Sequence, residues 1–125
     1  MEKQSHKEAA LSFLKLVASG KIREAYDQHV SANFFHHNPY FKGDRESLLV
    51  AMEQAEAQFP EKFLQVQRTF EDGDFVAVHS SMLLKPGMQP IAVVHMFRFE
   101  GDLIMEEWEV GQQVPEQSPN EHGMF

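Results

Sequence analysis

The chain has 125 residues, 42% of them hydrophobic, and a formal net charge of −8, which predicts one globular domain over residues 1–125. The acidic balance disfavours nucleic acid and membranes as partners, because both require a basic surface on the protein. The sequence has no cysteine, no apolar run near the ~20 residues that span a bilayer and no signal-peptide core at its N-terminus, so we expect a cytoplasmic protein without disulfides.

The N-terminal half shows the apolar spacing and the cap residues of helices. Ser5 is the predicted N-cap of a first helix, and Gly20 is its predicted stop. A short second helix follows. Asp44 is the predicted N-cap of a third helix, which Pro60 ends. Between the second and third helices, segment 30–43 contains Asn-Pro and Gly, which interrupt regular structure.

The C-terminal half alternates apolar and polar residues, which predicts strands. Two turns, at Glu71–Asp74 and at Gly101-Asp102, join these strands into hairpins. Three helices followed by about four antiparallel strands, with no βαβ alternation, predict an α+β domain whose curved sheet wraps around the helices and encloses a pocket. The predicted division is 1–60 mainly helical, 61–114 antiparallel sheet and 115–125 irregular tail.

The last hairpin carries the candidate functional residues. Glu107 and Glu109 lie two residues apart on one strand, so their carboxylates share a face. If the turn has three residues, His95 on the preceding strand opposes Glu107 and joins that face. If the turn has two residues, His95 opposes Trp108 and points away, unless a β-bulge restores the shared face. The sequence leaves this register open, and a solvated sheet face is the alternative to an acid/base site.

Three pieces of the sequence carry a resemblance to a known family. They are His37-Asn38-Pro39, the stretch Val93–Glu109 around the last turn, and the tail Gln113–Phe125. Together with the order of elements, they resemble the SnoaL-like branch of the nuclear transport factor 2-like superfamily. Within that branch, the chain resembles small proteins described as predicted aldol-condensation-catalysing enzymes. The resemblance implies cone-shaped helices packed in a curved antiparallel sheet, the cystatin-like α+β roll.

The chain also departs from that family. Where the family's polyketide cyclases carry His-Trp-Asp, this chain has Glu107-Trp108-Glu109. The family's acid/base carboxylate therefore corresponds to Glu109, and its histidine corresponds to Glu107. A cyclase histidine one strand earlier corresponds to His95, where many relatives of the aldol-type branch carry aspartate. The resemblance thus keeps proton transfer possible and leaves the substrate undefined.

The resemblance implies a pocket for a small hydrophobic carbonyl compound and allows a cofactor-independent cyclase, isomerase or lyase. Such an enzyme needs a carboxylate that takes a proton from carbon next to a carbonyl, and a donor to the enolate oxygen. We assign Glu109 as the base, His95 as its partner and Glu107 as a further member of the catalytic set, with Asn38 or His37 as donors. The alternative is a non-catalytic small-molecule-binding or dimerisation module of the same fold.

The predicted substrate-binding residues are His37, Asn38, His79 and Trp108. Because His36 and His37 are adjacent, only one of them can face inward from an extended segment, and the matched motif favours His37. His79 either lines the pocket or pairs with a surface neighbour.

No cofactor is predicted, because the acid/base scheme requires none. A metal site could form only if distant residues converge, namely His37, His79, His95, Glu107 and Glu109. No metal is predicted, because the sequence lacks the short His-x-His or His-Glu-x-x-His spacing that zinc sites often use. The resemblance also implies a homodimer formed through the open face of the sheet. The end of the tail, Met124-Phe125, would then pack on the partner or over the pocket mouth.

Overall fold

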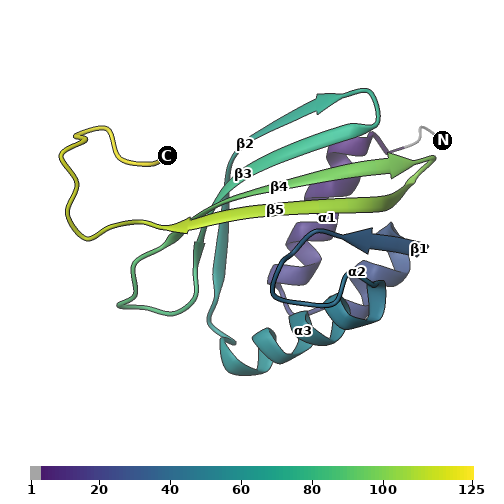
Figure 1. Ribbon diagram of the computed structural model, residues 1–125, viewed down its shortest axis with the longest axis horizontal. Coiled ribbons are helices and arrows are strands. Elements are labelled where there is room, and N and C mark those ends of the chain that lie inside the picture. The colour runs from purple at the N-terminus through teal and green to yellow at the C-terminus, as the bar shows by residue number, and fades with distance from the viewer. Residues whose placement is uncertain (1–3) are drawn as a thin grey trace.

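Five strands form one curved mixed sheet, and three helices cover one of its faces (Figure 1). The computed structural model describes residues 4–125. The elements in chain order are α1 (His6–Ala18), α2 (Ile22–His29), β1 (Val30–His36), α3 (Arg45–Gln58), β2 (Phe63–Asp72), β3 (Phe75–Leu83), β4 (Ile91–Glu100) and β5 (Leu103–Gln113). The strands lie in the order β1-β5-β4-β3-β2. The predicted α+β class is confirmed.

Capping side chains set the helix starts. Ser5 Oγ accepts a hydrogen bond from the backbone N–H of Glu8 at 3.1 Å, and Asp44 accepts one from the N–H of Ser47 at 3.2 Å. Both predicted N-caps are therefore confirmed. Gly20 follows α1 with a φ of +84°, a conformation that glycine adopts without strain. Within residues 4–125, no helix has the length and apolarity needed to cross a membrane.

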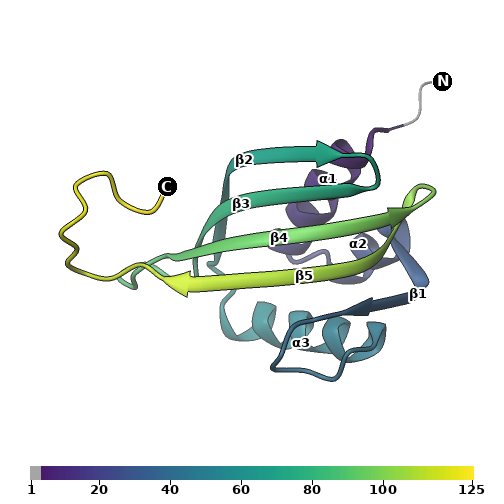
Figure 2. The same cartoon turned by 45° about the horizontal axis from the view of Figure 1, so that its top comes forward.

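The prediction of about four antiparallel strands is wrong in one respect, because the sheet has a fifth strand. β1 is formed by Val30–His36, where regular structure was expected to be interrupted, and it pairs in parallel with β5 (Figure 2). The helix-breaking Asn38-Pro39 follows this strand and does not interrupt it. As a result, the loop after β1 lies beside β5.

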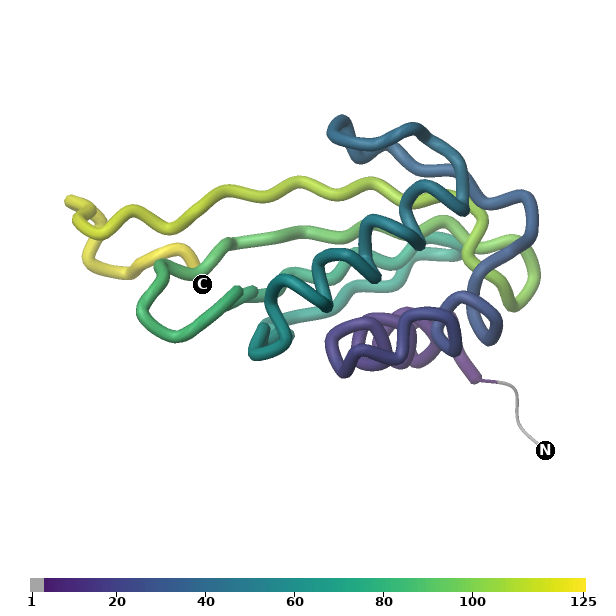
Figure 3. The backbone as a smooth tube through the Cα atoms, turned by 90° about the horizontal axis from the view of Figure 1, so that it is seen from below, coloured from purple at the N-terminus to yellow at the C-terminus, as the bar shows by residue number. Residues whose placement is uncertain are grey.

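The three helices lie against one face of the sheet, its inner face (Figure 3). Aliphatic and aromatic side chains form the hydrophobic core. The ring of Phe13 on α1 meets Tyr26 on α2 at 5.6 Å and Phe97 on β4 at 5.8 Å, both edge to face. Burying each such ring stabilises the fold by about 1.5–3 kcal/mol. This core fixes α1 and α2 against the strands that carry the candidate site.

A β-bulge sets the register of the last hairpin. Gly101 and Asp102 form a two-residue turn between β4 and β5, and Gly101 has a φ of +59°. Beyond the turn, the pairing shifts between Phe99 and Arg98, where Met105 of β5 is the extra residue. The bulge places the odd-numbered residues of both strands beyond it on the same face of the sheet.

Candidate functional site

The inner face of β4 and β5 brings together one histidine and two glutamates. His95 lies opposite Glu109 in the ladder, and Glu107 precedes Glu109 by two residues on the same face. His95 Nε2 lies 2.8 Å from Glu109 Oε1. One ring nitrogen of His95 and one carboxylate oxygen of each glutamate lie within 4.8 Å of one another. Of the two registers that the sequence allowed, the two-residue turn with a compensating bulge is the one observed.

The carboxyl group of Glu107 is buried and accepts no hydrogen bond from any residue in the described part of the chain. The whole residue is only 7% exposed. Burial raises the pKa of Glu107 to about 7, since a carboxylate loses solvation when it leaves water. The charge of His95 opposes this shift, and the charge of Glu109 adds to it. Glu107 can therefore gain or lose a proton near neutral pH.

His95 and Glu109 form a partly buried ion pair in which each partner favours the charged form of the other. Burial alone would lower the pKa of His95, but the hydrogen bond and charge of Glu109, followed by the charge of Glu107, raise this pKa above its ordinary value. Burial alone would raise the pKa of Glu109, but the hydrogen bond and charge of His95 hold it below its ordinary value. Imidazolium and carboxylate therefore coexist over a wide pH range.

The loop after β1 holds Glu109 from the other side. Asn38 Nδ2 donates a hydrogen bond to Glu109 Oε2 at 2.9 Å. The backbone N–H of Asn38 donates to His36 Nδ1 at 3.1 Å, and its Oδ1 accepts from the N–H of Tyr40 at 3.1 Å. Because His36 Nδ1 is an acceptor, its Nε2 carries the proton and donates to the carbonyl of Lys42 at 2.8 Å. Asn38, which was expected to bind a substrate carbonyl, instead positions the Glu109 carboxylate.

The expectation that His37 faces inward is wrong. His36 is buried, whereas the ring of His37 lies on the outer face of the sheet, the face away from the helices. There His37 Nε2 lies 2.6 Å from Glu106 Oε2, and its ring stacks on Trp108 with centroids 5.0 Å apart. The parallel pairing of β1 with β5 explains this, because His36 aligns with the inward-facing Glu107 and the next residue faces the other way.

Two more of the predicted substrate-binding residues also lie on the outer face. Trp108 alternates with Glu107 and Glu109 and stacks with His37. His79 contacts the guanidinium of Arg68, and its ring lies 5.8 Å from that of Phe125. His79 is therefore a surface partner, the second of its two predicted positions. Of the four predicted binding residues, Asn38 is the one that touches the His95 and glutamate cluster.

Two buried hydroxyl groups near the site were not identified from the sequence. They belong to Tyr26 on α2 and Ser80 on β3, and neither has a hydrogen-bond partner within residues 4–125. His95 Nδ1 also lacks a partner within these residues. Burial, followed by the charge of Glu107, raises the pKa of Tyr26 well above its ordinary value. Ser80 opposes Val93, which precedes His95 by two residues on the same face. Apolar spacing places Tyr26 in the core but carries no signal for a polar role.

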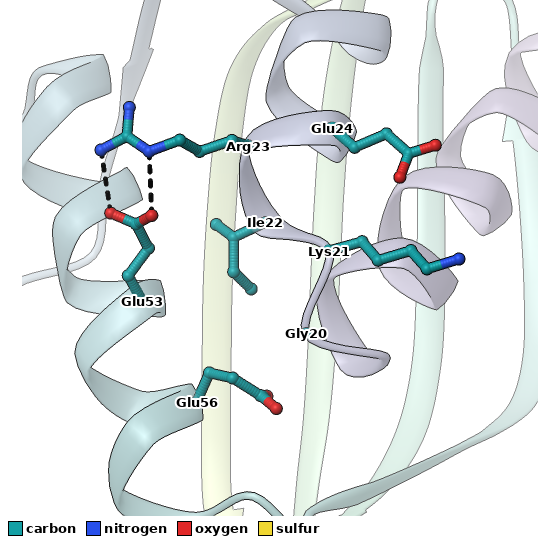
Figure 4. Close-up of a pocket in the computed structure, with 7 residues that line it drawn as sticks. All are labelled: Gly20, Lys21, Ile22, Arg23, Glu24, Glu53 and Glu56. Carbon is teal, nitrogen blue, oxygen red and sulfur yellow. Dashed lines mark hydrogen bonds and ion pairs between the residues drawn. The ribbon is translucent and has the colours of Figure 1, made fainter.

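Three hollows on the molecule lie away from this cluster. One of about 410 Å³ lies between α1 and β2, and one of about 200 Å³ lies beside the N-terminus of α1. Another, of about 390 Å³, lies between α2 and α3, where Arg23 makes hydrogen bonds of 2.9 and 3.0 Å to Glu53 (Figure 4). None of these three is lined by His95, Glu107 or Glu109.

Solved structures share this fold at low sequence identity. An uncharacterised cystatin-fold protein from Novosphingobium aromaticivorans superposes with a TM-score of 0.75 at 16% identity, over 86% of this chain and 99% of that one. IdmH, a proposed polyketide cyclase from Streptomyces antibioticus, superposes with a TM-score of 0.73 at 18% identity, over 87% of this chain and 93% of IdmH. A proposed polyketide cyclase from Bacillus cereus superposes with a TM-score of 0.74 at 21% identity, over 86% of this chain and 74% of that one. These likenesses show the nuclear transport factor 2-like and cystatin-like fold.

The comparison with curated proteins finds no match. The family model described as the SnoaL-like domain matches residues 10–107, which is most of the chain. The aldol-type branch within that family stays a prediction. The chain therefore belongs to the SnoaL-like domain family.

Proposed function

We propose that this SnoaL-like domain transfers a proton at a carbon next to a carbonyl group of a small hydrophobic compound, without a cofactor. Aldol cyclases, isomerases and some lyases share this step. The observation that carries the proposal is the buried carboxyl group of Glu107, whose pKa lies near 7, beside the His95–Glu109 ion pair. A group that titrates near the working pH is effective both as a base and as an acid.

Glu107, and not Glu109, is the proposed base. Glu109 accepts hydrogen bonds from both His95 and Asn38, and its low pKa makes it a weak base. Ionised Glu107 lacks such partners within the described residues and takes the proton from the substrate carbon. The C–H bond breaks, its electron pair moves into the enolate, and an O–H bond forms on Glu107. The protonated Glu107 then gives a proton back to the anionic intermediate, which forms the neutral product and restores the carboxylate.

The enolate oxygen needs a hydrogen-bond donor, and His95 supplies one. In the imidazolium form, its Nε2–H donates to Glu109, while its Nδ1–H is buried and has no partner in the described part of the chain. The buried hydroxyl of Tyr26 offers a second hydrogen-bond donor. A fixed donor in a site that excludes water stabilises developing negative charge more strongly than water does. This is the support for His95 as the proposed donor and Tyr26 as its assistant.

The charges and the surroundings favour a neutral, apolar substrate. Two carboxylates, on Glu107 and Glu109, oppose the entry of an anion. The buried ring of Phe97 lies opposite Glu107 on the neighbouring strand, and the ring of Phe34 lies in the same core. A compact ketone with a ring or an alkyl chain fits this chemistry better than a phosphorylated or carboxylated metabolite.

The test is an exchange reaction that needs no knowledge of the natural substrate. The protein is incubated in D2O with a panel of neutral cyclic and aromatic ketones, and NMR follows the loss of the proton next to each carbonyl. We expect accelerated exchange for at least one compound, and Glu107→Gln should slow it by about 100-fold or more. Glu106→Gln, the adjacent outer-face glutamate, is the matched control and should keep the rate.

Exchange that survives Glu107→Gln would refute the assigned base. Binding of a ketone, seen as shifts in the protein NMR spectrum, without exchange of any compound in the panel would favour the non-catalytic binding module.

A further inference from the structure

We infer that His95, Glu107 and Glu109 form a binding site for one divalent ion of the zinc type. Their donor atoms, one imidazole nitrogen and two carboxylate oxygens, lie within 4.8 Å of one another on two neighbouring strands. Such a set matches the three protein ligands that zinc commonly takes, with a further position left open. The inference goes beyond the proposed function, because ion binding requires no substrate.

The spacing of the donor atoms fits one ion. Zinc binds imidazole nitrogen and carboxylate oxygen at about 2.0–2.2 Å, so two ligands of the same ion lie about 3.0–3.5 Å apart. His95 Nε2 and Glu109 Oε1 are 2.8 Å apart. One oxygen of Glu107 lies within 4.8 Å of one donor atom of each of these two residues. Small rotations of the two flexible glutamate side chains bring all three donors to an ion placed between them.

The unpartnered carboxylate of Glu107 is a second observation that points to a cation. Glu107 is buried, and no residue in the described part of the chain donates a hydrogen bond to it. A buried carboxylate without a partner is costly, and the cost falls when a cation lies beside it. With a neutral His95, the two carboxylates carry two negative charges, which one divalent ion balances.

The loop after β1 supports the same site. Asn38 Nδ2 donates to Oε2 of Glu109, which fixes the carboxylate and leaves Oε1 directed at His95. A hydrogen bond to a ligand side chain from a neighbouring residue orients that ligand toward the metal. Imidazole with only two carboxylates suits zinc better than calcium, which takes six to eight oxygens, or magnesium, which prefers octahedral oxygen sites. The spacing rule for histidine pairs could not find this set, because its one histidine, His95, lies on β4 and its two glutamates lie on β5.

A bound zinc ion would inhibit the proposed proton transfer, since it would occupy the proposed base, Glu107, and its neighbour Glu109. The two ideas can be tested apart. Ion binding is measured without a ketone, and proton exchange is measured with a chelator present.

The experiment is isothermal titration calorimetry of the tag-free, chelator-treated protein with zinc chloride and, separately, magnesium chloride. We expect one zinc per chain with a micromolar or tighter Kd, and no binding of magnesium. Removing a residue that only hydrogen-bonds to a metal ligand weakens binding by about 10–100-fold, so removing a ligand itself should weaken zinc binding at least as much. Glu107→Gln and Glu109→Gln are the test variants, with circular dichroism to confirm that both are folded.

Glu106→Gln is the control, because it disables the other His–Glu pair of the sheet, His37 with Glu106, and should leave zinc binding unchanged. Cobalt in place of zinc should give a visible absorption band that Glu107→Gln abolishes. Absence of zinc binding to the wild-type protein would overturn the inference. So would binding that Glu106→Gln removes and that Glu107→Gln leaves intact.

Discussion

The two faces of the β4–β5 hairpin carry the same pair of residue types in different surroundings. On the inner face, His95 pairs with Glu109 at 2.8 Å, and on the outer face, His37 pairs with Glu106 at 2.6 Å. The outer pair includes a third group, because Arg98 Nε donates to Glu106 Oε1 at 2.9 Å. The inner pair has two neighbours: the amide of Asn38, which donates to Glu109 Oε2 at 2.9 Å, and a second carboxylate, Glu107.

On each face, the carboxylates that receive hydrogen bonds are ionised at neutral pH, and a buried carboxylate that receives none holds a proton more readily. Burial alone would raise the pKa of Glu106, but hydrogen bonds from His37 and Arg98 lower it, so this group stays ionised at neutral pH. On the inner face, His95 pairs with Glu109, and Glu107 is left without a hydrogen bond from the described residues. Both inner donors, His95 and Asn38, reach Glu109. A buried carboxylate that no donor reaches holds a proton near neutral pH, and proton transfer needs such a group.

The largest expected effect is the pH-dependent change in the free energy of unfolding when Glu107 is replaced, which should differ from the change at Glu106. Because burial raises the pKa of Glu107 from about 4.5 to about 7, its ionisation in the folded state costs stability as pH rises through this window. At pH 9 the cost approaches about 3 kcal/mol. Glu107→Gln should therefore increase the free energy of unfolding at pH 9 by up to that amount, and little at pH 4. Urea denaturation at both pH values measures this.

Glu106→Gln should instead decrease the free energy of unfolding at pH 9 and change it little at pH 4. The lowered pKa of Glu106 contributes stability above its pKa in the unfolded chain, and this contribution is lost as pH falls. Equal changes for Glu107→Gln at pH 4 and pH 9 would contradict the difference between the faces.

The next effect concerns the inner pair. Glu109→Ala leaves the buried His95 without its partner, and losing one partner of a buried pair costs about 3–5 kcal/mol. Because the side chain of Glu109 is 32% exposed and His95 can lose its proton, we expect a smaller loss, about 2 kcal/mol, at pH 6. The pKa of His95 should also fall, which NMR of the imidazole protons measures. An unchanged pKa of His95 would show that the pair is not formed in solution.

The smallest effect is expected on the outer face. His37→Ala removes a half-exposed partner of Glu106, while Arg98 remains. Such surface pairs contribute about 0–1 kcal/mol, so the free energy of unfolding should change within that range. The pH dependence caused by Glu107 should persist. A loss well above this range would mean that the stack of His37 on Trp108 supports the hairpin more than its ion pair does.

Local signals predicted much of the fold. Ser5 and Asp44 cap their helices as the sequence indicates, and the turn at Gly101-Asp102 is where glycine and aspartate predict it. β1 was missed because it is short and pairs with a strand about 70 residues away, so nothing in its own sequence reveals the partner.

The site could be predicted only in part. The residues His95, Glu107 and Glu109 were identified, but their shared face depends on one bulged residue, Met105, that no sequence pattern marks. The choice between His36 and His37 depends on the parallel β1–β5 register, which the sequence does not display. A resemblance transfers residue positions along the chain, but the face that each side chain takes is decided by pairing. The homodimer through the outer face stays a prediction.

The central claim is that Glu107 holds a proton near neutral pH, whereas Glu106, one residue away, does not. Carbon-13 NMR of the glutamate carboxyl groups during a pH titration tests it directly, with Glu107→Gln and Glu106→Gln used to assign the two signals. We expect the Glu107 signal to titrate with a midpoint near pH 7 and the Glu106 signal to titrate below the ordinary range of a glutamate. A Glu107 midpoint near 4.5, about that of a solvated glutamate, would contradict the account.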